Sequence, residues 1–85
     1  MVGVVVPSIL AAQAEGRKRF EVEAETVADA LHALPVADLL FNERGDLVGH
    51  VNVYVDGIDH RECGGLGGRV ADAREIRVVA MVSGG

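Results

Sequence analysis

The chain has 85 residues, of which 49% are hydrophobic and 25% are charged, and its formal net charge is -5. These values predict one small folded domain and exclude an intrinsically disordered chain. The excess of acidic residues makes nucleic acid and anionic membrane surfaces unexpected partners, and it favours a protein partner with a basic docking face.

Two strands are predicted near the beginning of the chain. Residues 2–6 are rich in valine and end at Pro7, which cannot donate a hydrogen bond to a sheet. A second strand is predicted over residues 17–24, because from Arg19 to Ala24 polar and apolar side chains alternate, which is typical of a half-buried strand. We expect these strands to pair as a hairpin across the connection at residues 11–16.

A helix is predicted next. Thr26 and Asp29 have the spacing of an N-cap and a third helical residue, and apolar residues then recur on one helical face. The helix is expected over residues 27–34, where Pro35 stops it. Residues 36–41 are consistent with a second short helical turn.

The second half of the chain contains two further predicted strands. A polar turn at residues 42–46 precedes an alternating strand at 50–56 with its valines facing inward. Residues 58–74 are rich in glycine and are expected to be irregular, and residues 75–82 form the last strand.

The order of these elements predicts an α+β fold in which a mixed sheet of four to five strands carries one main helix across one face. This is the order of the ubiquitin-like β-grasp fold, in which the first and last strands lie side by side in the centre. We expect a β-grasp domain over residues 1–81 and a flexible C-terminal tail over residues 82–85.

The sequence ends with Gly84 and Gly85 directly after the last predicted strand and Ser83. Glycine has no Cβ, so such an ending is flexible, narrow enough to enter a confined channel, and leaves its carboxylate unhindered. The glycine content of the chain can by itself produce this ending, so it needs support from the other features.

The chain resembles the bacterial sulfur carrier proteins of the molybdopterin synthase small subunit and thiamine-thiazole carrier superfamily. Its Val-Asn-Val-Tyr-Val strand and Pro-Ser-Ile-Leu segment are most similar to the actinobacterial cysteine-synthesis carriers. Four segments carry the resemblance, in the first strand, the passage into the helix, the central strand and the last strand with its tail: residues 2–10, 20–31, 50–55 and 75–85.

The resemblance implies a chemistry for the tail. A ubiquitin-activating-type adenylyltransferase and sulfurtransferase would use ATP to adenylate Gly85, and a sulfide or persulfide donor would convert it to a thiocarboxylate. The sulfur would then pass to an accepting biosynthetic enzyme. The chain itself would be no enzyme and would bind no cofactor, and its tail would enter the active sites of its partners: Val82, Ser83, Gly84 and Gly85.

A partner docking surface is predicted on the outward face of the sheet beside the tail. Apolar side chains at outward positions are unnecessary for a monomer but are typical of protein interfaces. The alternative is that a few exposed apolar residues are normal on any protein. The predicted docking residues are Val5, Tyr54, Val79 and Met81.

Other candidate sites are weaker. The glycine-rich run at residues 64–68 lacks the lysine and the strand context of a phosphate-binding loop, and a surface connection is favoured. His32, His50 and His60 have no zinc-ligand spacing, so no metal site is predicted. A nucleophilic Cys63 activated by His60 is less favoured than an inert thiol beside an ordinary loop histidine.

Asp56 and Asp59 lack the further oxygen ligands of a calcium loop and are interpreted as turn residues. Because Cys63 is the only cysteine, no internal disulfide is expected. The sequence shows no secretory signal and no apolar run long enough to span a bilayer, so a cytoplasmic protein is predicted.

Three classes of function remain open: a sulfur carrier, a ubiquitin-like modifier joined to lysines through Gly85, and a small binding module. Within the first class, the acceptor could belong to cysteine synthesis, thiazole formation or the synthesis of a sulfur-containing metabolite, or the chain could be a molybdopterin synthase small subunit. The sequence does not distinguish these acceptors.

Overall fold

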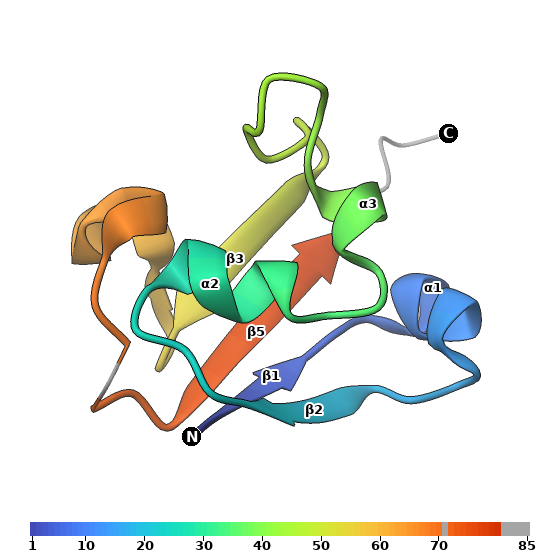
Figure 1. Ribbon diagram of the computed structural model, residues 1–85, viewed down its shortest axis with the longest axis horizontal. Helices are drawn as coiled ribbons and strands as arrows, with labels where there is room; N and C mark the ends of the chain where they lie inside the picture. The colour runs from blue at the N-terminus through green and yellow to red at the C-terminus, as the bar shows by residue number, and fades with distance from the viewer. Residues whose placement is uncertain (71, 81–85) are drawn as a thin grey trace.

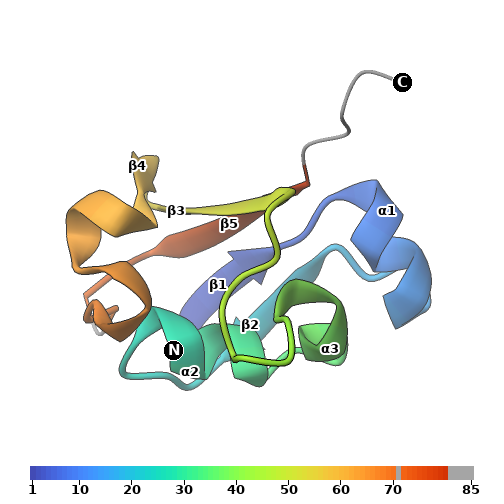
Figure 2. The ribbon, with the colours of Figure 1, turned by 90° about the horizontal axis from the view of Figure 1, so that it is seen from above.

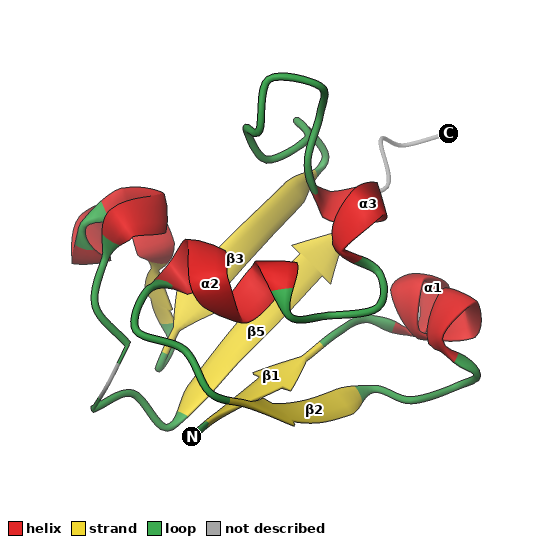
Figure 3. Cartoon of the chain, viewed as in Figure 1, coloured by secondary structure: helices red, strands yellow, loops and turns green. Residues whose placement is uncertain are grey.

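The structure is a computed structural model, and it describes residues 1–70 and 72–80. The described part contains a five-stranded sheet, three short α-helices and three 3-10 turns (Figures 1 and 3). In chain order they are β1 (Val2–Val5), α1 (Ser8–Ala11), η1 (Ala12–Ala14), β2 (Arg19–Val22), α2 (Val27–His32), α3 (Ala37–Leu40), β3 (Val51–Val55), β4 (Ile58–Asp59), η2 (His60–Cys63), η3 (Gly65–Gly67) and β5 (Glu75–Ala80).

The strands lie in the order β2-β1-β5-β3-β4. The first and last strands, β1 and β5, run parallel in the middle of the sheet, whereas the other neighbouring pairs are antiparallel. This topology confirms the predicted β-grasp fold. The predicted boundary between the domain and the tail at residues 81 and 82 lies outside the described residues.

The helices cover one face of the sheet and leave the other face open (Figure 2). On the covered face, the inward side chains of the strands pack against apolar side chains of α2 and α3. The most deeply buried side chains of this core, from strands and helices alike, are less than 2% exposed. Burial of these apolar side chains is the main source of the domain's stability. They include Val4, Leu31, Leu40, Val53 and Ile76.

The helix α2 begins where the sequence predicts it. The side chain of Thr26 accepts a hydrogen bond from the backbone N–H of Asp29 at 3.2 Å, which is the expected N-cap bond. The helix ends at His32, two residues before the predicted end, although Leu34 is still buried at 4% exposure. The short helical turn predicted at residues 36–41 is confirmed as α3.

The connection between the first two strands differs from the prediction. Residues 8–14 form α1 and η1, to which the sequence analysis assigned no structure, and Leu10 and Ala11 are buried in the core. Glu15 and Gly16 then adopt positive φ angles of 57° and 85° and turn the chain into β2. A helix of only four residues has too few turns to show a helical period in the sequence.

The glycine-rich segment is also more ordered than predicted, because it contains β4, η2 and η3. Gly68 lies so close to the preceding turn that a Cβ there would overlap the carbonyl oxygen of Cys63. Gly64 adopts a φ of 99°, which side chains rarely tolerate. The glycines therefore serve tight backbone packing.

Within the described part of the chain, no helix has both the length and the apolar character needed to cross a membrane.

Candidate functional site

The predicted reactive tail lies outside the described residues, as does Met81, so the site is described from the strand that leads to them. That strand, β5, is paired on both sides, with β1 from Gly3 to Val5 and with β3 from Val51 to Val55. The last described residue, Ala80, is therefore reached through the centre of the sheet. A tail that follows β5 is attached to a strand that is hydrogen-bonded on both sides.

One row of side chains crosses the open face of the sheet at the height of Arg77. The strand registers set Arg77 beside Val5 on β1 and beside Tyr54 on β3. The same row continues to Arg19 on β2 and to Asp59 on β4. Neighbours in such a row are close enough for their side chains to interact.

Three of the residues predicted to form the docking surface are gathered on this face. Val5, Tyr54 and Val79 are half-buried. Val79 lies two residues after Arg77 on β5, on the same face of the sheet, and opposite Asn52 on β3. The side chain of Arg77 is 56% exposed between them. The described part of the surface is therefore apolar with a cation at its centre.

A groove of about 200 Å³ lies on this surface at the end of β5. The large apolar side chains that are exposed in the described part of the chain lie elsewhere, at Met1, Ile9, Leu39 and Ile58. The groove is thus lined by buried and half-buried apolar side chains together with the exposed side chain of Arg77. Its lining residues are Val5, Val6, Pro7, Arg77, Val78, Val79 and Ala80.

An ionic network on the same face was missed by the sequence analysis. Arg19 contacts Glu21 at 3.3 Å and Glu75 at 3.5 Å, and Arg77 contacts Glu75 at 3.2 Å. All four side chains are at least one-third exposed, so each pair contributes little to stability. These charged residues stand at outward positions of strands whose side chains alternate, and this pattern in the sequence could have revealed the ion pairs.

On the β4 side of the open face, Asp59 accepts several hydrogen bonds. Its carboxylate accepts hydrogen bonds from the backbone N–H and the guanidinium of Arg61 at 2.8 to 3.0 Å, and from the Nδ2 of Asn52 at 3.2 Å. These bonds, chiefly those from Arg61, hold the pKa of Asp59 well below its usual range. The same pairing raises the pKa of Arg61.

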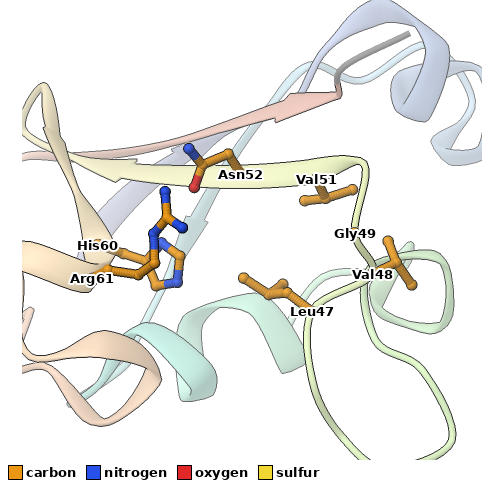
Figure 4. A pocket seen from close by; sticks show the side chains of 7 residues that line it. All are labelled: Leu47, Val48, Gly49, Val51, Asn52, His60 and Arg61. Atoms are coloured by element: carbon orange, nitrogen blue, oxygen red, sulfur yellow. The ribbon is translucent and has the colours of Figure 1, made fainter. Parts of the chain in front are cut away.

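The sequence suggested that His60 is an ordinary loop histidine, but the structure shows that its side chain is buried. Its Nδ1 lies 3.0 Å from the carbonyl oxygen of Val53. A carbonyl can only accept, so Nδ1 donates this bond. Figure 4 shows His60 and Arg61 on one side of a hollow of about 270 Å³, with Leu47 and Val48 on the other.

The remaining candidate residues have structural contacts. The carboxylate of Asp56 accepts from the backbone N–H groups of Arg74 and Glu75, which ties the turn after β3 to the start of β5. Cys63 is half-buried and packs against the hydrophobic core. Among the described residues there is no cluster of three or more side chains that could hold a metal ion.

The parallel central strands, the covering helix and the open face define a ubiquitin-like β-grasp protein. A scan against protein-family models found no match, and neither did a search of curated proteins. Solved structures do match. CysO from Mycobacterium tuberculosis is 26% identical with a TM-score of 0.82, and the alignment covers 96% of this chain and 100% of CysO.

CysO from Amycolatopsis orientalis, solved in a BexX/CysO complex, is 29% identical with a TM-score of 0.82 and covers 100% of both chains. SAMP1 from Haloferax volcanii is 32% identical with a TM-score of 0.74, and the alignment covers 99% of this chain and 98% of SAMP1. These neighbours are small ubiquitin-like sulfur carriers or modifiers. The chain belongs to this family of ubiquitin-like sulfur carriers and modifiers.

Proposed function

We propose that this chain carries sulfur as a thiocarboxylate on Gly85. The carboxylate of Gly85 attacks the α-phosphate of ATP on a ubiquitin-activating-type enzyme and expels pyrophosphate. Sulfide then attacks the acyl carbon and expels AMP, which leaves a carbon–sulfur bond. The observation that supports this is a Gly84-Gly85 ending after the central strand of a carrier-family domain.

The chain acts in this scheme as a co-substrate and not as a catalyst. The activating enzyme supplies the ATP site, so no cofactor needs to bind the chain itself. The accepting partner is a biosynthetic enzyme of cysteine synthesis or of a sulfur-containing metabolite. The Amycolatopsis CysO was solved in complex with BexX, which supports a protein as the accepting partner. We place these reactions in the cytoplasm.

The docking surface for both partners consists of Val5, Tyr54, Val79 and Met81, with Arg77 at its centre. Half-buried apolar side chains around a cation suit a partner that offers an apolar patch and a carboxylate. Through this surface the partner would align the tail residues Val82, Ser83, Gly84 and Gly85 with its active site.

Intact mass spectrometry tests the proposal. After incubation with ATP, sulfide and an activating enzyme from the same host, we expect a gain of about 16 Da at Gly85, because sulfur replaces one oxygen. An unchanged mass, with an activating enzyme proven competent on another carrier, would favour the binding-module alternative.

Two variants separate the tail from the docking surface. Gly85→Ala should fold normally but gain sulfur at least about tenfold more slowly, because a Cβ at the end crowds the active site. Val79→Asp should lower the rate to a similar degree by weakening docking. Leu39→Asp, which alters an exposed apolar residue on α3, serves as the matched control and should react at the normal rate.

A second candidate function is that of a protein modifier. The similarity to SAMP1, named as a small archaeal modifier protein, favours it. Conjugation through Gly85 would leave Gly-Gly remnants on target lysines after digestion, whereas a carrier leaves none. Both functions begin with the same acyl-adenylate, so mass spectrometry of the host's lysines decides between them.

A further inference from the structure

We propose that two copies of this chain pair with each other along the outer edge of β2. This strand is at the end of the sheet, and only β1 pairs with it in the part of the chain that the structure describes. In Figure 1 it forms the lower margin of the sheet. The interface is separate from the tail, and it would exist whether or not the chain carries sulfur.

The backbone of β2 has hydrogen-bonding groups available at this edge. The N–H of Val6 donates to the carbonyl of Lys18 at 2.8 Å, so Lys18 is bonded toward β1. In an antiparallel ladder the bonded residues alternate, so Phe20 also bonds toward β1. Arg19 and Glu21 therefore point their N–H and C=O groups away from β1 and outward.

The charges along this edge change sign at Phe20. Positions 17–19 are all basic, whereas positions 21, 23 and 25 are all acidic. The side chains of Arg19 and Glu21 are each 55% exposed, on the open face of the sheet. The edge therefore has a basic half and an acidic half of similar length.

This pattern is complementary to itself when the strand is reversed. Antiparallel pairing about a twofold axis at Phe20 sets Arg19 opposite Glu21 of the second copy, and Glu21 opposite its Arg19. Each such pair can exchange both backbone hydrogen bonds. A shift by two residues in either direction sets Arg19 against Arg19 or Glu21 against Glu21 at the axis, so each neighbouring register contains a like-charge pair that the register centred on Phe20 avoids.

Charged side chains on an edge strand usually prevent such pairing. A run of one sign would do so in every register, but a run that changes sign at its centre attracts its own copy most strongly in the register centred on that change. The paired segment is short, so the association should be weak, with a Kd on the order of 10⁻⁴ M. A second copy is therefore the occupant that the charges of this edge favour.

Sedimentation equilibrium of the full chain under reducing conditions tests the proposal. The average mass should rise from 8.9 kDa toward twice that value as the concentration increases. Arg19→Glu and Glu21→Arg should each weaken the dimer by at least about tenfold, because both Arg19–Glu21 pairs across the interface become like-charge pairs. Arg44→Glu and Glu43→Arg make the same changes of net charge in an exposed turn and should not affect it.

Charge exchange makes the test specific. The double variant Arg19→Glu with Glu21→Arg should dimerise again, and a mixture of the two single variants should form a mixed dimer. The amide protons of Arg19 and Glu21 should exchange more slowly at high concentration. A mass of 8.9 kDa at all concentrations up to about 1 mM, well above the expected Kd, would overturn the proposal. Dimers that are insensitive to both reversals would do the same.

Discussion

The two edges of the sheet are constructed in opposite ways. On the β3 edge, the carbonyl of Val53 accepts from His60 and its N–H donates to the Oδ1 of Asn52, so side chains satisfy the backbone where β4 no longer reaches. On the β2 edge, the backbone groups of Arg19 and Glu21 face outward. Side chains therefore occupy the outward backbone groups of Val53, whereas those of Arg19 and Glu21 are available to another strand.

This difference favours strand addition at the β2 edge. A sheet with two open edges can polymerise, whereas a sheet with one open edge can at most form a closed pair. We therefore expect changes at the β3 edge to lower the stability of the monomer, and changes at the β2 edge to alter association without lowering stability much. Four predictions test this contrast.

The largest effect should come from His60→Ala. The substitution leaves the carbonyl of Val53 without its donor and opens a cavity beside β3, so the free energy of unfolding should fall by about 2 to 3 kcal/mol. Urea denaturation measures it. His50→Ala, which changes an exposed histidine just before the same strand, is the control and should have almost no effect. Equal stabilities of the two variants would contradict the role given to His60.

Asn52→Ala should have the next largest effect. Its side chain joins the Val53 N–H to the carboxylate of Asp59, and its loss should cost about 1 kcal/mol. The amide proton of Val53 should also exchange faster, which nuclear magnetic resonance can follow. An unchanged exchange rate would mean that Asn52 does not protect this edge.

A pH-dependent effect should follow from Asp59. Because its pKa is lowered in the folded state, its contribution to stability is present above the pKa of an unfolded aspartate, near 4, and is lost as the pH falls below that value. Asp59→Asn should therefore be less stable than the parent chain at neutral pH. The difference should shrink between about pH 4 and pH 2, as measured by thermal unfolding at each pH. A constant difference would contradict the assignment.

The smallest effect on monomer stability should come from Arg19→Glu. Its ion pairs with Glu21 and Glu75 are exposed, so the free energy of unfolding at micromolar concentration should change by no more than about 0.5 kcal/mol. Chemical denaturation of a dilute sample measures it. A loss as large as that of His60→Ala would show that the two edges do not differ in the way described.

The sequence was sufficient to predict four of the five strands, all but β4. The alternation of side chains in a strand follows directly from the pleat. The inward and outward positions of Val53 and Tyr54 are correctly predicted on this basis. The outward positions of Tyr54 and Val79 were predicted in the same way. The β-grasp topology followed from the order of the elements and from the family resemblance.

The contacts at the edges were not predictable, because they depend on register and on chain segments that return from elsewhere. The burial of His60 requires a short β4 followed immediately by a 3-10 turn that folds back beneath β3. Arg77 becomes the centre of a row only after β1 and β3 are aligned with β5. A local sequence pattern contains neither fact.

The parallel pairing of β1 and β5 has a mechanical consequence. An enzyme that pulls on the chain beyond Ala80 applies its force along β5, which is hydrogen-bonded on both sides. The force is then shared by many backbone bonds in shear, and these bonds do not open one after another from a free end. A carrier built in this way can be drawn firmly into a partner's active site and released again while its domain stays folded.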